Sequence, residues 1–212
     1  MFKTILFDVD GTLIDTEYVM TKSLQKTLFE EKGIDVPVEE LQFILGIPGK
    51  EAIKRFVSDE TEMLQLLEKW SKNVLVFSEY ATLFPEVKET IKSLKEKGFI
   101  LGLVTSKTTL EMKNEFVPFD LNHYFEVVVT ASDTQFHKPN PDPIQKAIDL
   151  LGVDKSETIY IGDSIYDMKS AKSCGVQFGL AEWGALKHIS FDQVDFTFQT
   201  PKDVLTQIHE IV

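Results

Sequence analysis

The stretch Ile5–Thr12, ILFDVDGT, decides how the rest of the sequence is interpreted. It is a short apolar run followed at once by two aspartates and a glycine. A run of this kind, bounded by Gly11, is typical of a buried parallel strand that ends in a loop. Because side chains alternate along an extended segment, Asp8 and Asp10 lie on one side of it and Val9 on the other. The sequence therefore predicts a sheet with two carboxylates at the carboxyl end of a strand.

Six apolar runs have the length of strands, and helical patterns separate most of them. The runs cover residues 5–9, 100–104, 125–129, 158–161, 176–180 and 194–198. One intervening helix has apolar residues at helical spacing from Val87 to Leu94 and is expected to stop at Gly98. Another begins with Asp142 and Pro143, which suit a helix N-terminus. This alternation predicts an α/β fold with a Rossmann-like, doubly wound parallel sheet, whose ligand site lies beyond the carboxyl ends of the strands.

The segment between residues 16 and 81 breaks this alternation. It offers helical patterns and no convincing strand, and the patterns cover residues 19–31, 38–45 and 60–70. We therefore expect residues 16–81 to form an α-helical cap domain, inserted into a Rossmann-like catalytic core made of residues 1–15 and 82–212.

Composition narrows the classes of partner. The formal net charge of −12 would repel polyphosphate backbones, so nucleic acid is not expected to bind. An acidic chain still accommodates a small anion where a metal and a few donors reverse the potential locally. Cys174 is the single cysteine, which excludes an internal disulfide and a zinc finger. The N-terminal residues suit neither a signal peptide nor a membrane span, so we expect no membrane partner and a cytoplasmic location.

Two further polar groups lie near the predicted carboxyl edge of the sheet. Thr105 and Ser106 follow the 100–104 run, where their hydroxyl and N–H groups would either hold phosphate oxygens or form a capping turn. Lys138 lies in the proline-stiffened loop 137–143, HKPNPDP, which would fix one ammonium near the sheet edge.

A last acidic pair, Asp163 and Asp167, follows the 158–161 run. Carboxylate oxygens with open positions suit magnesium. Alternatively, Ser164 caps a helix and both acids are placed there by its positive N-terminus. The motif taken alone leaves the two interpretations evenly matched.

In their order and their position after strands, the four groups resemble the haloacid dehalogenase superfamily, over the span from Asp8 to Asp167. The resemblance implies that Asp8 is a covalent nucleophile and Asp10 the general acid and base. It also implies that Thr105 and Lys138 hold the phosphoryl group. Dehalogenation is not expected, because in that branch the position two residues after the nucleophile is not an acid.

The resemblance further implies a Mg²⁺ site and a substrate loop. Asp8, Asp163 and the backbone carbonyl of Asp10 would bind the ion, and Asp167 would bind it through water or orient the other groups. The loop residues Gly11, Thr12 and Ser106 are expected to contact the substrate.

An insertion between the first two motifs is similar to the cap of phosphoglycolate phosphatases, bacterial pyrophosphatases and β-phosphoglucomutase. The mutase branch carries a cap histidine shortly after the first motif, and residues 16–20 contain none.

The segment Leu45–Lys50 resembles a cap loop that reaches the active site. In that case Lys50 would contact a second anionic group of the substrate; otherwise Lys50 is simply solvated. Two further readings stay open: a pyrophosphatase or mutase-like phosphotransferase, and a catalytically silent binding protein on the same fold.

The leading expectation is a magnesium-dependent phosphatase that acts on a small phosphorylated metabolite and resembles phosphoglycolate phosphatase. The silent alternative is disfavoured because the nucleophile, the acid, the lysine and the metal carboxylate are all present in the sequence.

Overall fold

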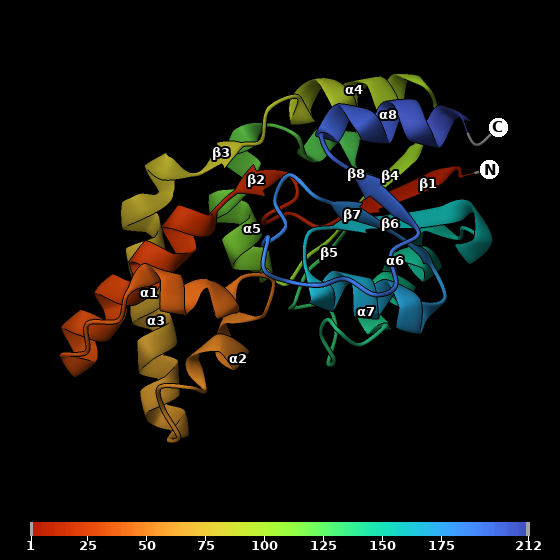
Figure 1. The fold of residues 1–212 in the computed structure, drawn as a ribbon. Helices are drawn as coiled ribbons and strands as arrows, with labels where there is room; N and C mark the ends of the chain where they lie inside the picture. Colours follow the sequence, from red (N-terminus) through yellow and green to blue (C-terminus); the bar gives the residue numbers. More distant parts are fainter. Residues whose placement is uncertain (1, 211–212) are drawn as a thin grey trace.

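The computed structural model describes residues 2–210 and contains a six-stranded sheet with helices on both faces (Figure 1). The strand order is β5-β4-β1-β6-β7-β8, and every neighbouring pair is parallel. The strands are β1 (Thr4–Phe7), β4 (Ile100–Val104), β5 (Val127–Val129), β6 (Thr158–Gly162), β7 (Gln177–Ala181) and β8 (Phe196–Phe198). Each of the six predicted runs overlaps a strand, and the predicted doubly wound α/β fold is confirmed.

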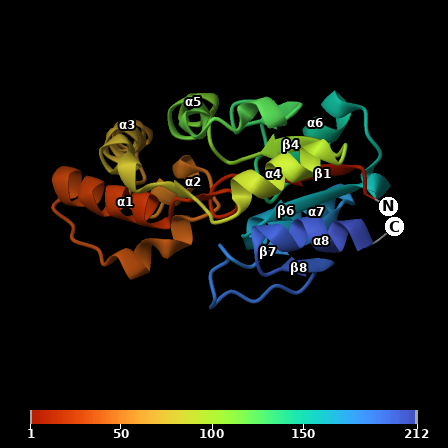
Figure 2. The ribbon, with the colours of Figure 1, turned by 90° about the horizontal axis from the view of Figure 1, so that it is seen from above.

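Helices cover the sheet in two layers. On one face α4 (Val87–Glu96) packs beside α8 (Pro201–Glu210), and on the other α6 (Asp142–Leu151) packs beside α7 (Ile165–Cys174) (Figures 1 and 2). A shorter helix, α5 (Thr109–Glu115), follows the carboxyl end of β4. The helices therefore shield both faces of the sheet from water. Strands that are covered on both faces consist of consecutive apolar residues, as the sequence shows.

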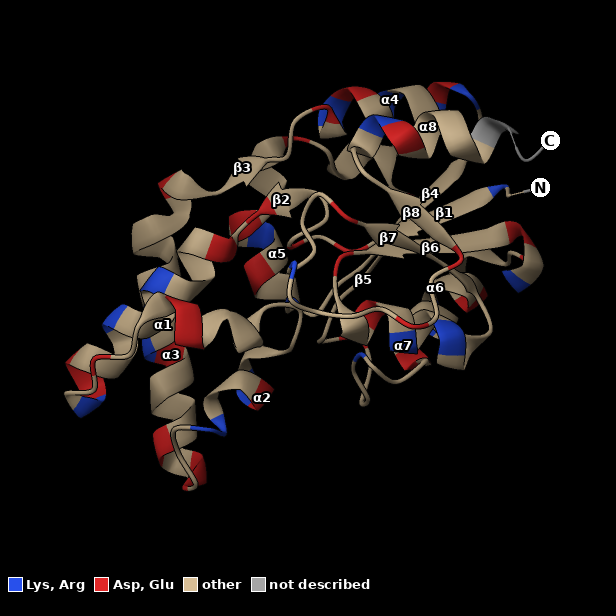
Figure 3. Cartoon of the chain, viewed as in Figure 1, with Lys and Arg blue, Asp and Glu red and all other residues tan. Residues whose placement is uncertain are grey.

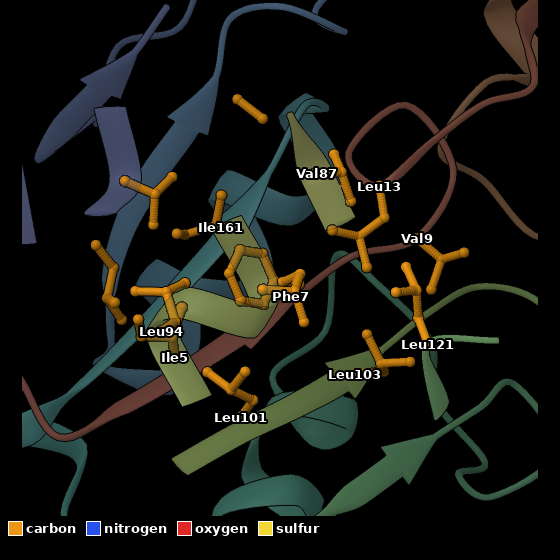
Figure 4. Close-up of a cluster of buried hydrophobic side chains, with 14 of the residues drawn as sticks. Ile5, Phe7, Val9, Leu13, Val87, Leu94, Leu101, Leu103, Leu121 and Ile161 are labelled. Carbon is orange, nitrogen blue, oxygen red and sulfur yellow. The ribbon is translucent and has the colours of Figure 1, made fainter. Parts of the chain in front are cut away.

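The central strand β1 contributes side chains to a hydrophobic cluster on each face of the sheet. Ile5 and Phe7 belong to the cluster beneath α4, together with Leu94 (Figure 4). Leu6 points the other way and packs in the cluster that contains Ile148 of α6. Burying one such side chain contributes about 1.5–3 kcal/mol. The core thus fixes the position of the loop that leaves β1.

Strand β1 ends two residues earlier than the sequence predicts. Asp8 still donates its N–H to the Ile161 carbonyl at 2.9 Å, but the Val9 carbonyl accepts N–H groups from Leu13 and Ile14 at 2.8 and 3.0 Å. This tight turn draws the chain out of the ladder directly after Asp8. The two aspartates therefore lie in the loop and not in the strand.

Between residues 16 and 81 the chain forms α1 (Glu17–Lys32), α2 (Gly49–Ile53) and α3 (Glu60–Phe77), with 3-10 turns at Val38–Ile44 and Ser78–Tyr80. The long helices α1 and α3 pack against each other (Figure 1). This segment has its own hydrophobic cluster, built around side chains such as Leu24, Leu28, Leu66 and Trp70. The predicted 38–45 helix is a 3-10 helix, and α3 extends seven residues beyond its predicted end.

Two short strands that the sequence does not predict join this segment to the sheet domain. β2 (Ile14–Asp15) and β3 (Thr82–Leu83) pair antiparallel, with Ile14 opposite Leu83. The ribbon holds the entry and the exit of the helical segment side by side. Strands of two residues carry too little alternation to be recognised in a sequence.

Short 3-10 helices at Val117–Phe119, Asn122–Tyr124 and Lys155–Glu157 complete the described elements. None of the helices described within residues 2–210 combines the length and the apolar character that a membrane crossing requires.

Candidate active site

Three adjacent strands bring the predicted polar residues together. β1 lies between β4 and β6, and all three run in the same direction. Asp8 follows β1, Thr105 follows β4 and Asp163 follows β6. Acidic segments at this edge lie between the sheet and the helices α1 and α3 (Figure 3). The site is therefore at the carboxyl ends of the strands, where open α/β sheets bind their ligands.

A buried ammonium joins two carboxylates at the centre of the site. Lys138 Nζ lies 2.9 Å from Asp8 Oδ1 and 2.7 Å from Asp167 Oδ1, and it also donates to the Tyr160 hydroxyl at 3.2 Å. All four side chains are buried. Burial opposes the charge on Lys138, but Asp167 and Asp8 outweigh it and raise the pKa of this lysine above its ordinary value. Lys138 is therefore charged.

The carboxylates repel one another in this buried setting. Burial raises the pKa of Asp8 to about 7, against the lowering effect of Lys138. Burial, then repulsion from Asp167 and Asp8, raises the pKa of Asp163 well above its ordinary value. One oxygen from each of the three aspartates lies within 4.8 Å of the others. A divalent cation would offset this repulsion, and an all-oxygen donor set fits a hard cation such as Mg²⁺.

Gly11 and Thr12, expected to contact the substrate, both pack against Asp163. The fully buried Thr12 donates its hydroxyl to Asp163 Oδ1 at 3.0 Å. Gly11 has φ +73°, and a Cβ there would lie 2.2 Å from Asp163 Oδ2. Gly11 still lines the cavity described below. The Thr12 hydroxyl is directed at Asp163, because the turn after β1 points it at the end of β6, and a substrate contact of Thr12 stays a prediction.

Asp167 takes part in the helix cap, which is one of the two roles that the sequence leaves open, and its other oxygen contacts Lys138. Its Oδ2 accepts the Ser164 N–H at 3.0 Å and the Ser164 hydroxyl, which forms a capping box at the start of α7. Its Oδ1 faces Lys138 and the Tyr160 hydroxyl. Capping by one oxygen therefore fixes the direction in which the other meets the lysine.

Asp10 lies at the rim of the site, and both its oxygens are occupied. Oδ1 accepts the Thr16 hydroxyl at 2.9 Å, and Oδ2 lies 2.9 Å from Lys107 Nζ. The same ammonium lies 2.5 Å from Glu115 Oε2 of α5. Sequence reasoning missed Lys107 and Glu115. The position of Lys107 directly after the Thr105 motif was a usable signal, whereas nothing in the sequence pattern marks Glu115.

The loop before α2 touches the motif that follows β4. The Ser106 hydroxyl donates to the Gly46 carbonyl at 3.5 Å. Gly46 has φ +80°, and a Cβ there would lie 2.8 Å from Ser164 Cβ. Thr105 is buried, and its hydroxyl accepts the Lys107 N–H at 3.2 Å. The helical segment therefore meets the sheet domain directly over the site.

A cavity of about 450 Å³ lies between the two parts of the chain. Its sheet-domain wall carries most of the charged groups and includes Asp8, Asp10, Thr105, Ser106, Lys107 and Asp163, beside apolar side chains such as Phe84 and Trp183. Its opposite wall is largely apolar and includes Met20, Leu45, Ile47, Leu67, Trp70 and Val74. A second cavity, of about 820 Å³, lies on the other side of the Gly46 loop and reaches Lys138 and Asp163.

Lys50 does not reach the site. Its side chain is 55% exposed, its Nζ lies 3.9 Å from Glu60 Oε1, and it lines neither of these two cavities. Lys50 belongs to the first turn of α2 and faces the start of α3, so helix geometry turns it away from the sheet. The expectation that it meets a second anionic group therefore has no support in this arrangement.

A sequence model of haloacid dehalogenase-like hydrolases matches residues 5–181. The chain belongs to this family. It is 37% identical to "Putative pyrophosphatase PpaX" of Caldanaerobacter subterraneus subsp. tengcongensis, over 86% of this chain and 82% of the relative. It is 31% identical to a phosphoglycolate phosphatase of Aquifex aeolicus, over 96% and 95% of the two chains. The predicted family is confirmed.

Among solved structures of haloacid dehalogenase-like hydrolases and related proteins, one titled "putative phosphoglycolate phosphatase" from Lactobacillus plantarum superposes with a TM-score of 0.89. The alignment covers 97% of this chain and 99% of that one at 24% identity, so the likeness concerns the fold. A structure of CbbY from Rhodobacter sphaeroides in complex with phosphate has a TM-score of 0.82 at 22% identity. The helical segment is therefore part of a fold shared over nearly the whole chain.

Proposed function

We propose that this chain is a magnesium-dependent phosphatase that hydrolyses a small phosphorylated metabolite through an aspartyl phosphate at Asp8. The observation that carries the proposal is the buried cluster in which Lys138 bridges Asp8 and Asp167 while Asp163 lies beside them. Membership of a hydrolase family and relatives named as phosphatases support it.

Asp8 is suited to be the nucleophile by position and surroundings. Its Oδ1 is fixed by Lys138, and its carboxylate borders the cavity. Attack of a carboxylate oxygen on phosphorus forms the Asp8–phosphoryl bond and breaks the bond to the leaving oxygen. Lys138 and Thr105 would hold the phosphoryl oxygens, since positioned charges supply most of the stabilisation in such transfers.

Asp10 is suited to move protons on both sides of the reaction. It would donate a proton to the leaving oxygen and later accept one from the water that attacks the phosphoryl group. That attack releases phosphate and restores the Asp8 carboxylate. The side chain lines the cavity and accepts the Thr16 hydroxyl.

Asp8, Asp163, Asp167 and the carbonyl of Asp10 would hold the Mg²⁺. When bound, the ion supplies positive charge against the phosphoryl oxygens and offsets the mutual repulsion of the carboxylates. The hydroxyl of Thr12 holds Asp163 in place, and Ser164 holds Asp167, so the protein orients its ligands without the ion.

Residues 16–81 would act as a cap over this site. Their independent hydrophobic cluster and the β2–β3 ribbon at residues 14–15 and 82–83 allow the segment to move as a unit about that ribbon. Closure would exclude bulk water while the phosphoryl group is transferred to Asp8, and the apolar wall would select the remainder of the substrate. Met20 stands on the cavity wall in the stretch where the mutase branch has a histidine, which disfavours a phosphotransferase.

The test is a panel of phosphoglycolate, pyrophosphate, sugar phosphates and 4-nitrophenyl phosphate, with phosphate release measured with Mg²⁺ and with EDTA. We expect magnesium-dependent release from monoesters. Pyrophosphate is the second candidate, favoured by the name of the Caldanaerobacter relative. No release from any compound by folded protein would indicate a catalytically silent protein and refute the proposal.

A further inference from the structure

Lys107 is a buried charge outside the group of residues that the proposed reaction uses. Its side chain is 5% exposed, and its Nζ has two carboxylate partners, Asp10 at 2.9 Å and Glu115 at 2.5 Å. The backbone of Lys107 is anchored at both ends: its N–H donates to the Thr105 hydroxyl, and its carbonyl accepts the Ala131 N–H at 2.8 Å. The ammonium is thus fixed in the first loop after β4.

A buried lysine is retained only where its charge is compensated, because an unpaired ammonium is costly to remove from water. Asp10 alone would compensate one charge at the rim of the cavity. Glu115 adds a second carboxylate, which comes from α5, so the ammonium has two acidic partners. Glu115, Lys107 and Asp10 thus form a row of ion pairs that runs from α5 to the proposed general acid.

The other oxygen of Asp10 has an equally specific partner. Thr16 donates its hydroxyl to Oδ1 at 2.9 Å, and Thr16 stands at the start of α1. The Asp10 carboxylate is therefore held between the helical segment and the sheet domain. Of its two partners, Lys107 is the one that belongs to the rigid sheet domain, and it remains in place if the segment moves.

We propose that Lys107, held by Glu115, is a positioning residue that sets the direction of the Asp10 carboxylate for proton transfer. The inference rests on the proposed phosphatase function and adds to it two residues with no part in the steps above. Proton transfer requires the donor and acceptor to approach within about 2.6–3.2 Å. A carboxylate free to rotate at the cavity rim would meet this condition in only a fraction of its orientations.

The alternative is that the row is a structural ion pair that merely stabilises the loop after β4. The two roles differ in which chemical step they affect. Release of 4-nitrophenolate, a good leaving group, needs little help from an acid, whereas release of an alkoxide needs a proton. Hydrolysis of the aspartyl phosphate needs Asp10 as a base with either substrate.

The experiment compares wild type, Lys107→Met and Glu115→Gln by rapid mixing with 4-nitrophenyl phosphate and with glycerol phosphate, in the presence of Mg²⁺. The matched control is Lys113→Met, an exposed lysine of the same helix α5. Acid-quenched samples report the amount of phosphorylated protein during turnover, and thermal unfolding reports on folding.

For Lys107→Met we expect a fast initial release of 4-nitrophenolate, a steady-state rate lowered about 100-fold, and accumulation of phosphorylated protein. With glycerol phosphate the initial step also slows by about 100-fold, so phosphorylated protein accumulates no more than in wild type. Glu115→Gln is expected to show the same pattern with a smaller loss, and Lys113→Met to match wild type.

With 4-nitrophenyl phosphate, equal losses in the initial and steady-state phases would overturn the positioning role and leave the proposed function intact. No loss with either substrate in folded variants would do the same. Should Lys107→Met fail to fold, Glu115→Gln decides the matter by the same criteria, because it keeps the lysine. Wild-type protein that hydrolyses neither substrate would instead refute the proposed function, and this inference with it.

Discussion

Replacing Gly11 with alanine tests whether the turn after β1 holds Asp163 as a metal ligand. A Cβ at this position would lie 2.2 Å from Asp163 Oδ2 and 2.5 Å from Asp163 Cγ. The Thr12 hydroxyl binds the other oxygen, Oδ1, at 3.0 Å. The carboxylate therefore cannot stay where it is once the methyl group is added.

Two separate costs follow from the structure. Gly11 has φ +73°, and a residue with a Cβ in the left-handed region costs roughly 1–2 kcal/mol of stability. In addition, the Asp163 oxygen must retreat by roughly 1 Å, several times the ~0.2 Å within which metal–ligand distances are held. Disturbing the support of a ligand typically lowers metal affinity by about 10–100-fold. We expect a loss of that size for Mg²⁺.

Gly33 provides a control in which only the first cost applies. It has φ +67°, and a Cβ there would meet nothing within 4 Å. Gly33→Ala is therefore expected to lose about 1–2 kcal/mol of stability with an unchanged Mg²⁺ affinity. The assays are urea unfolding and calorimetric titration of each purified variant with Mg²⁺. Equal Mg²⁺ affinities in wild type, Gly11→Ala and Gly33→Ala would refute the reasoning.

Three further predictions follow from single contacts. Lys50→Ala is expected to leave kcat/KM within about twofold for every substrate of the panel, because the side chain faces solvent and Glu60; a loss confined to doubly anionic substrates would contradict this. Asp163→Ala should abolish the rise in Tm that Mg²⁺ gives, since one oxygen ligand is lost; a wild-type response would remove Asp163 from the metal site. Trp70→Phe should cost about 1 kcal/mol in urea unfolding, because the Ser23 hydroxyl loses the indole N–H at 2.8 Å, and an unchanged midpoint would speak against that bond.

The fold is predictable from the sequence because its signals are local. Short apolar runs, residues 5–7 before Asp8 and residues 100–104 before Thr105, predict buried parallel strands, and the carboxyl ends of parallel strands meet at one edge. The place of the site residues can be predicted for the same reason, since Asp8, Thr105 and Asp163 each follow a strand. These three residues come close together once β4, β1 and β6 are neighbours in the sheet.

The features missed or misplaced depend on the direction of a side chain or on contacts between distant elements. Lys50 was placed near the site by its loop, but its direction is set by the packing of α2 against α3. Glu115 of α5 contacts Lys107 from eight residues further along the chain, and no periodicity encodes that contact. The bond from the Thr12 hydroxyl to Asp163 likewise depends on the turn after Val9, which the sequence pattern does not specify.

The most direct test of the account is to trap the phosphorylated protein. Wild type and Asp8→Asn would be mixed with 4-nitrophenyl phosphate and Mg²⁺, quenched in acid during turnover and digested for mass spectrometry. The account predicts one phosphoryl group on Asp8 in wild type, none in the variant, and no turnover by the variant although its Tm is close to that of wild type. A phosphoryl group on another residue, or substantial turnover by folded Asp8→Asn, would contradict it.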